Sequence, residues 1–130
     1  MTPQYIEIDI HGNKFYCKDK EMKILHREDG PAVEWTDGTK FWWLNGERHR
    51  EDAPAVEHAN GNKSWWLNGK RHREDGPAIE YTDGYKEWYL NGLHHTEKEF
   101  KMKTAKEIVL TMDEIADKFG IDVSKLKIKK

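Results

Sequence analysis

The heptapeptide His-Arg-Glu-Asp-Gly-Pro-Ala at residues 26–32 decides how this chain is built, because it returns twice at a fixed distance. It reappears as His-Arg-Glu-Asp-Ala-Pro-Ala at residues 49–55 and unchanged at residues 72–78, a period of 23 residues. Thirteen of the 23 positions are identical in all three copies. A period of this length indicates a repeat protein, in which one small unit is stacked on the next.

Each unit has the pattern of short strands joined by tight turns. In the first copy, Asp37-Gly38 and Asn45-Gly46 are the two dipeptides most typical of two-residue β-hairpin turns. Pro31 marks the break between units, since proline cannot donate to a sheet ladder. The strands we expect in this copy are residues 32–36, residues 39–44 and a third that begins at residues 47–49. We therefore predict a mainly β fold, an elongated antiparallel meander sheet with a short C-terminal helix and strand as a cap.

These patterns divide the chain into two parts. Residues 1–97 form the repeat sheet, which comprises an N-terminal half-repeat at residues 5–25 and repeats at residues 26–48, 49–71 and 72–94. Residues 98–130 form a basic, β-α-β-like cap, with a strand at residues 100–103, a helix that begins at Thr111 and ends near Gly120, and a strand at residues 125–129. Residues 113–121 are also similar to the first half of a helix-turn-helix, but the ten residues after Gly120 do not make a recognition helix.

Composition and charge limit the function classes. Hydrophobic residues make up 36% and charged residues 35% of the chain, which suits a thin sheet covered by its six Trp rather than a thick core. Residues 1–97 hold 13 basic and 18 acidic side chains, a net charge of −5, whereas residues 98–130 have a net charge of +3. The acidic body argues against nucleic acid as the partner. The single cysteine, Cys17, fits a reducing compartment, and we expect no signal peptide, no membrane span and a cytoplasmic location.

The alternation of side chains along strands predicts two faces. With a two-residue turn at residues 37–38, Val33 would pair with Trp42. One face would then hold Val33, Trp35, Trp42, Leu44 and His49, and the other Glu34, Phe41, Trp43 and Arg48. Aromatic residues and arginines recur on the second face, which is an interface composition. The partner-binding residues that we predict there are Trp43, Trp66, Tyr89, Phe41, Arg48 and Arg71. The alternative is that these rings rigidify the sheet beneath the arginine stems.

The repeated polar residues do not predict a catalytic or metal site. Equivalent histidines in successive units should lie roughly 10 Å apart from sheet spacing, too far to share one zinc ion. The repeated Arg-Glu-Asp is better explained as a ladder of ion pairs and turn caps between units. Every polar cluster is triplicated, and no phosphate loop or nucleophile motif is present. We therefore expect no enzyme activity, no catalytic residues, no cofactor and no metal.

The stretch Trp43-Leu44-Asn45-Gly46-Glu47-Arg48-His49 has the form W-x-x-G-x-x-H, which returns at residues 66–72 and, with Tyr first, at residues 89–95. This resembles the MORN (membrane occupation and recognition nexus) repeat. The His-Arg-Glu-Asp-Gly-Pro-Ala motif is similar to a variant found in bacteriophage and large-virus proteins. The resemblance implies a non-enzymatic protein-binding module, a phage accessory protein that binds and inhibits a host defence protein in the bacterial cytoplasm.

Two alternatives remain open for the function. One is nucleic-acid or nucleotide binding through the exposed aromatics and the basic tail, since bases stack on exposed rings. The other is a purely structural homo-oligomer, such as a homodimer formed through the sheet edge. The partner itself, a host or viral protein, is not identified by the sequence.

Overall fold

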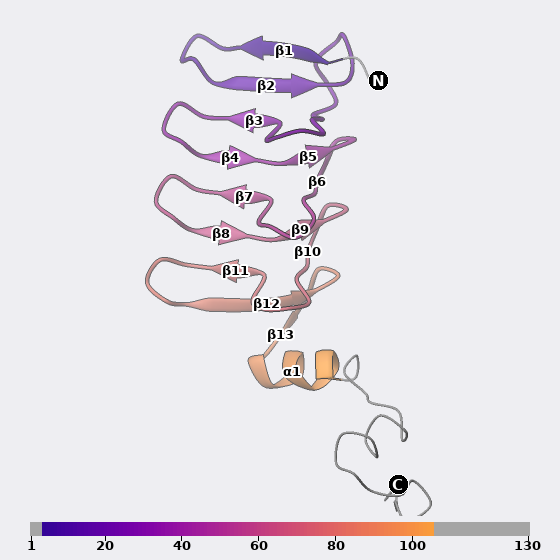
Figure 1. The fold of residues 1–130 in the computed structure, drawn as a ribbon, viewed down its shortest axis with the longest axis vertical. Helices are drawn as coiled ribbons and strands as arrows, with labels where there is room; N and C mark the ends of the chain where they lie inside the picture. Colours follow the sequence, from indigo (N-terminus) through magenta and orange to yellow (C-terminus); the bar gives the residue numbers. More distant parts are fainter. Residues whose placement is uncertain (1–3, 106–130) are drawn as a thin grey trace, which may run out of the picture.

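The computed structural model describes residues 4–105, and these form a mainly β protein in which hairpins are stacked along one long axis (Figure 1). A single short helix follows the last hairpin. The strands are β1 (Tyr5–Ile8), β2 (Lys14–Cys17), β3 (Val33–Glu34), β4 (Lys40–Phe41), β5 (Trp43–Leu44), β6 (Glu47–Arg48), β7 (Val56–Glu57), β8 (Lys63–Ser64), β9 (Trp66–Leu67), β10 (Lys70–Arg71), β11 (Ile79–Glu80), β12 (Lys86–Leu90) and β13 (Leu93–His95), and the helix is α1 (Glu97–Ala105).

Each repeat contributes two hairpins. The first hairpin joins a nine-stranded antiparallel sheet whose strand order, β1-β2-β3-β4-β7-β8-β11-β12-β13, follows the chain. The second hairpin is β5–β6 in the first repeat and β9–β10 in the second, and β13 pairs with the end of β12 in the third. The predicted antiparallel meander is therefore confirmed, with the second hairpins placed along one side of the stack (Figure 1).

The turn inside the first hairpin differs from the prediction by one residue. Val33 pairs with Phe41 rather than with Trp42, and the Trp35 N–H donates to the Thr39 carbonyl at 2.9 Å. The loop is therefore three residues long, residues 36–38, and it ends on Gly38 at a φ of 98°. A three-residue hairpin with glycine in the left-handed region is the next most common type after the two-residue turn. The second turn is as predicted, since Leu44 pairs with Glu47.

This one-residue shift makes the predicted faces wrong for Val33, Glu34 and Trp35, because a slip in register moves side chains to the opposite face. Phe41, Trp43 and Arg48 share one side as predicted. Val33 and Trp35 lie on the face of Phe41, where the Trp35 and Phe41 ring centroids are 5.2 Å apart. Trp42 lies instead on the face of Glu34 and Glu57, and the Arg50 guanidinium joins it to Glu57 there.

Two rows of side chains run across the large sheet. One row is mostly apolar and consists of Phe15, Val33, Phe41, Val56, Ser64, Ile79 and Glu87. The other row alternates in charge and consists of Lys14, Glu34, Lys40, Glu57, Lys63, Glu80 and Lys86. Opposite charges on neighbouring strands stabilise a sheet by roughly 0.2–1 kcal/mol per pair. The second row therefore reinforces every junction in the stack.

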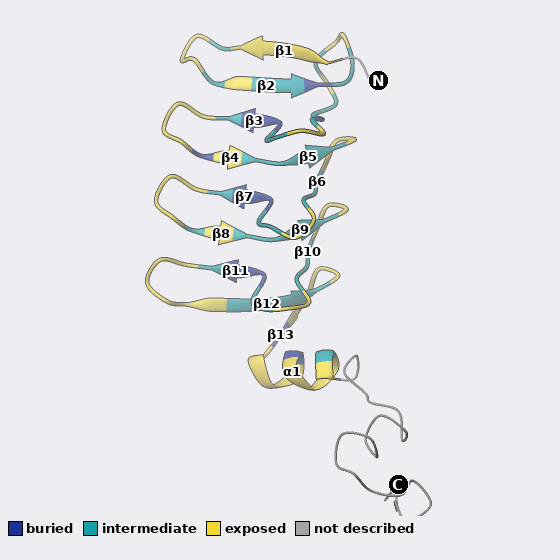
Figure 2. Cartoon of the chain, viewed as in Figure 1, coloured by how far each residue is buried: buried dark blue, intermediate teal, exposed yellow. Residues whose placement is uncertain are grey.

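The core is thin, as Figure 2 shows by the few buried segments. Its fully buried residues are small, namely Cys17 and the alanine that ends each heptapeptide: Ala32, Ala55 and Ala78. The next residue of each repeat is also buried: Val33, Val56 and Ile79. The tryptophans at positions 42, 43, 65, 66 and 88 are only partly buried, so they cover the sheet from both sides.

Neighbouring units are also joined through their first loops. Asn13 Oδ1 accepts the Thr36 N–H at 2.9 Å, and Asn62 Oδ1 accepts the Thr82 N–H at 3.0 Å. The loops approach so closely that a Cβ on Gly61 would lie 2.9 Å from Thr82 Cγ2. Gly84 has a similar positive φ but no neighbour within 4 Å of its Cβ position.

This difference gives a test of the loop contact. We expect Gly61→Ala to lower the free energy of unfolding by about 2 kcal/mol, because the methyl group adds a clash to the backbone strain. Gly84→Ala, the matched control, carries only the strain and should cost about 1 kcal/mol. Urea denaturation of both variants measures the difference. Equal losses for the two variants would contradict the contact between the loops.

The C-terminal segment differs from the prediction. Residues 100–103, predicted as a strand, lie within α1. Thr96 is the N-cap of this helix, since its hydroxyl accepts the Glu99 N–H at 3.1 Å and donates to the Glu99 carboxylate at 3.1 Å. Phe100 is buried against the last strands, and Lys103 Nζ lies 2.8 Å from His95 Nε2. The helix predicted from Thr111 and the strand predicted at residues 125–129 lie outside the described residues.

Candidate protein-binding surface

The second hairpins align arginines and aromatic rings on one side of the molecule. The Arg48 guanidinium lies between Trp43 and Trp66, with its carbon 5.3 Å and 5.1 Å from the two ring centroids. The Arg71 guanidinium lies in the same way between Trp66 and Tyr89, at 5.2 Å and 5.3 Å. We call these five residues the arginine–aromatic stripe. Because each arginine contacts rings from two successive units, the stripe runs across the repeats.

Phe41, the sixth predicted residue, flanks the stripe. Its ring centroid lies 5.7 Å from the Arg48 guanidinium carbon, and its ring also contacts Trp35 and His58. The structure therefore brings all six predicted residues to one side of the sheet. At the position equivalent to Phe41, Ser64 accepts a hydrogen bond from Trp66 Nε1–H at 2.9 Å.

Two members of this surface were missed by the sequence analysis. Trp35 is 44% exposed and extends the aromatic surface beyond Phe41, but the wrong register had placed it on the other face. His94 occupies the repeat position of Arg48 and Arg71, and its ring packs edge-on against Tyr89 at 5.2 Å. The 23-residue period alone is sufficient to identify His94 as the equivalent of Arg48 and Arg71.

Among the described residues, the stripe arginines have no acidic partner. Neither guanidinium has a carboxylate within 4.0 Å, and Nε of both is buried without a hydrogen-bond partner there. Burial lowers the pKa of Arg48 from its ordinary value, and the charge of Arg71 adds to this effect. The rings thus hold two like charges side by side without a neutralising anion, although each cation–π contact contributes only about 0.5–1 kcal/mol at exposed sites.

The arginines of the heptapeptide have the opposite environment. Arg27, Arg50 and Arg73 stack on the rings of Tyr16, Trp42 and Trp65 at 3.9 Å, 3.8 Å and 3.9 Å. Each donates to the carbonyl of the proline four residues later, and each lies within 4.0 Å of the glutamate seven residues later. Ion pairs are therefore present, but they join residues of the same repeat rather than successive units as predicted, and only the ring stacking reaches the preceding unit. These three arginines are structural.

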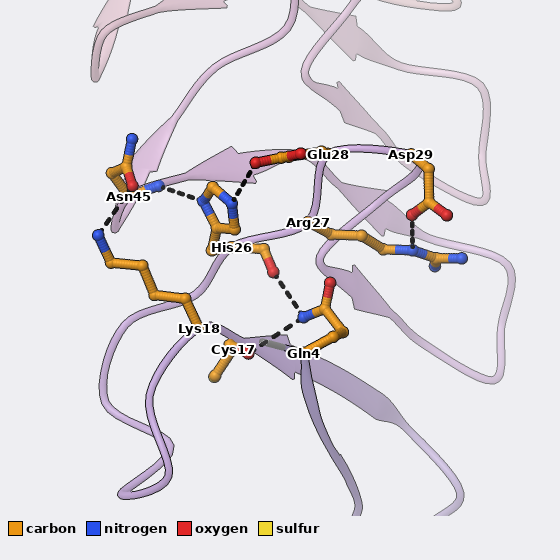
Figure 3. A network of polar contacts seen from close by, with 8 residues as sticks. All are labelled: Gln4, Cys17, Lys18, His26, Arg27, Glu28, Asp29 and Asn45. Carbon is orange, nitrogen blue, oxygen red and sulfur yellow. Dashed lines mark hydrogen bonds and ion pairs between the residues drawn. The ribbon is translucent and has the colours of Figure 1, made fainter. Parts of the chain in front are cut away.

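Each heptapeptide histidine caps the Asn-Gly turn of its own repeat. His26, His49 and His72 accept the backbone N–H of Asn45, Asn68 and Asn91 at 2.9 Å, 3.0 Å and 2.9 Å through Nδ1. Figure 3 shows the first of these junctions, where Lys18 also donates to the Asn45 side chain and Gln4 donates to the carbonyls of Cys17 and His26. The turn caps that are present therefore come from the histidines and lie within each repeat, rather than from Arg-Glu-Asp between units as predicted. No group of three or more metal-binding side chains occurs within residues 4–105.

The second repeat departs from the other two at Ala53. A Cβ on Gly30 or Gly76 would lie 3.0 Å from the guanidinium carbon of Arg27 or Arg73. With alanine at this position, the chain bends differently and Asp52 adopts a φ of 61°. A hollow of about 590 Å³ lies here, between the second and third heptapeptides. The arginines and histidines that line this hollow are already hydrogen-bonded within the fold, so fewer of its polar groups are available to a ligand than in the stripe.

Cys17, the only thiol of the chain, is fully buried. Burial raises its pKa, and the nearby carboxylates of Asp19 and Glu7 raise it further. Since the thiolate is the reactive form, these surroundings make the side chain a poor nucleophile.

The chain matches no protein-family model, no curated protein and no solved structure. The class that the fold defines is a mainly β repeat protein with an antiparallel meander sheet and one short helix after it. Within the described residues, no helix is long and apolar enough to cross a membrane. The similarity to MORN repeats stays a prediction from the sequence.

Proposed function

We propose that this chain is a non-enzymatic protein-binding module whose binding surface is the arginine–aromatic stripe. The observation that carries the proposal is the contrast between the two sets of arginines. Arg27, Arg50 and Arg73 have carboxylates of the fold beside them, whereas Arg48 and Arg71 have none within residues 4–105. A carboxylate supplied by a partner would neutralise both stripe arginines.

The rings support this proposal because interfaces are rich in tryptophan, tyrosine and arginine. All three stripe rings are partly buried. Trp66 contacts both Arg48 and Arg71, Tyr89 contacts Arg71 and His94, and Trp43 contacts Arg48, so little conformational entropy is lost when a partner covers them. The stripe therefore combines rigid rings with two unneutralised charges.

The spacing of the charges indicates what kind of segment would fit. Equivalent residues of successive repeats are two strands apart, roughly 10 Å at sheet spacing. In a polyproline II segment, which has three residues per turn and rises about 3.1 Å per residue, acidic side chains three residues apart lie on the same side and are separated by about 9 Å. A partner segment with acids at positions i and i+3 would thus reach both arginines.

The biological setting that we propose is a phage accessory protein acting in the host bacterial cytoplasm. The support is the similarity of the heptapeptide to a repeat variant of phage and large-virus proteins. In that setting the partner is a host protein, such as a defence protein, which the module inhibits by occupying the surface that presents the acidic segment.

The test removes both stripe charges in the variant Arg48→Gln/Arg71→Gln. We expect its affinity for a captured host protein to fall by about 100-fold or more, because hydrogen bonds to charged groups contribute about 1.5–3 kcal/mol each. Pull-down from a bacterial lysate identifies the partner, and calorimetry with the purified partner gives both dissociation constants. Thermal unfolding should show that the variant stays folded.

The matched control is Lys20→Gln/Lys23→Gln, which removes the same charge from two exposed lysines outside the stripe. Equal binding by the Arg48→Gln/Arg71→Gln variant and the wild type would contradict the proposed surface. Salt-sensitive binding of a single-stranded oligonucleotide, lost in the same variant and without any protein partner, would favour nucleic acid instead.

A further inference from the structure

The first strand of the large sheet has an open edge. β1 pairs with β2 on one side only and lies at the end of the stack (Figure 1). Ile6 is opposite Tyr16, whose N–H and carbonyl bond to Ala32 and His26 on the far side of β2. In an antiparallel pair, two residues that lie opposite each other direct their N–H and C=O groups either both toward or both away from the neighbouring strand. Because the main-chain groups of Tyr16 point away from β1, those of Ile6 point away from β2. The N–H and C=O groups of Ile6 and Ile8 therefore face outward.

The side chains at this edge alternate between apolar and acidic. Ile6 and Ile8 are 56% and 60% exposed, and the alternation of β1 places them on one face, whereas Ile10, 94% exposed, lies in the turn that follows. Glu7 lies on the other face, beside Phe15. An exposed apolar edge is a template for another strand. The opposite end of the stack is covered, because α1 packs on β12 and β13 with Phe100 buried.

A complementary pattern occurs in the sequence of the same chain. Residues 125–129, which lie outside the described residues, are Lys-Leu-Lys-Ile-Lys. In an added strand of either direction, Leu126 and Ile128 would lie beside the exposed isoleucines, and Lys127 would lie opposite Glu7. We infer that residues 125–129 of a second copy add to β1 as an edge strand, and that the two copies exchange this strand reciprocally to form a dimer.

A second copy is favoured over the same chain because folding back would stretch residues 106–124 along the whole sheet, whereas a flexible chain of that length has an end-to-end distance of roughly 24 Å. β1 and β12 are seven strand positions apart, roughly 34 Å at about 4.8 Å each. β1 and α1 therefore lie at opposite ends of the molecule (Figure 1). Two copies side by side in opposite directions bring each C-terminal segment next to the other copy's β1. The twofold exchange closes on itself, as in most soluble oligomers.

A direct contact between two β1 strands is disfavoured by charge. Two-fold pairing about Glu7 would place this carboxylate opposite its own copy, and like charges directly opposite destabilise a sheet. Lysines at residues 125, 127 and 129 replace this repulsion with attraction. The charge pattern of β1 thus selects a basic strand as its partner.

The experiment is a charge exchange in the full chain, followed by light scattering over a range of concentrations. Wild type should show twice the mass of one 15.4 kDa chain. Glu7→Lys or Lys127→Glu alone should raise the dimer dissociation constant about tenfold or more, since each exchange acts twice in the dimer. The double variant Glu7→Lys/Lys127→Glu should restore the dissociation constant of the wild type. A monomeric wild type, or a double variant no tighter than the single variants, would overturn the inference.

Cross-linking tells exchange between copies from folding back within one chain. Glu7→Cys and Lys127→Cys are placed on separate chains and mixed under mild oxidation, while the buried Cys17 stays unreactive. Paired residues of neighbouring strands come within disulfide distance, so a cross-linked dimer of the two variants should form. A third variant carries both substitutions in one chain. If a disulfide forms only within that chain, or if no disulfide forms at all, the inference is overturned.

Discussion

Replacing Trp65 by alanine lowers the free energy of unfolding by about 3 kcal/mol, near the lower end of the range for a large aromatic removed from a packed site. The ring supports the Arg73 guanidinium at 3.9 Å, and that guanidinium donates to the Pro77 carbonyl at 3.1 Å and bonds Glu80 at 3.1 Å. Loss of the ring exposes the arginine stem and loosens both bonds. Chemical denaturation of the full chain measures the change.

Trp35→Ala is the control for this prediction, because it removes the same side chain from an exposed position. We expect a loss of about 1 kcal/mol there, since the ring contacts Phe41 from one side only. The double variant Trp65→Ala/Arg73→Ala should lose less than the sum of the two single variants, because the ring and the guanidinium share one interaction. A Trp65→Ala variant as stable as Trp35→Ala would show that the heptapeptide arginine does not depend on its ring.

The 23-residue period predicted the architecture well because turn chemistry repeats with it. Asn45-Gly46 is a two-residue turn, as Asn-Gly usually is, and it placed the second hairpin correctly. Asp37-Gly38 misled the register because the same dipeptide also ends a three-residue loop. The residue before it, Thr36, is bonded to Asn13 of the previous loop, and that long-range contact has no local signal.

The helix α1 could have been predicted, since Thr96 and Glu99 have the spacing of a capping box. The alternation of Phe100 and Met102 between lysines favoured a strand instead. For the candidate site, the recurrence of aromatics and arginines was sufficient to select the residues of the stripe. Which arginines find a carboxylate could not be predicted, because that depends on which glutamates each guanidinium can reach in the folded stack.

The two faces of the sheet hold the repeats together through different contacts. On one face, arginines of the heptapeptide, rings and the alternating charge row hold neighbouring units together. The stripe face also joins successive units, because Arg48 and Arg71 each contact rings of two repeats. Beside these recurring rings the residues vary between repeats, as Phe41, Ser64 and Glu87 show. The surface next to the stripe therefore changes from one repeat to the next while the fold stays the same.

The Cys17 thiol reacts with a thiol reagent more than about 1,000-fold more slowly in the native chain than in denaturant, since a domain stable by about 5 kcal/mol exposes a buried group only rarely. Cys17 is fully buried, and its raised pKa further reduces the reactive thiolate. Trp65 lies between β8 and β9 in the second repeat, whereas Cys17 ends β2 in the first hairpin. The labelling rate of Cys17 therefore reports how far a local change is transmitted.

We expect Trp65→Ala to accelerate Cys17 labelling about 100-fold, the full effect of a loss of about 3 kcal/mol. The buried apolar residues of each unit are one alanine and one branched residue, so the unit is unstable alone and depends on its junctions. A short array held together in this way opens as a whole. An unchanged labelling rate in Trp65→Ala, with acceleration only in Tyr16→Ala beside the thiol, would show instead that the first hairpin opens independently of the repeats.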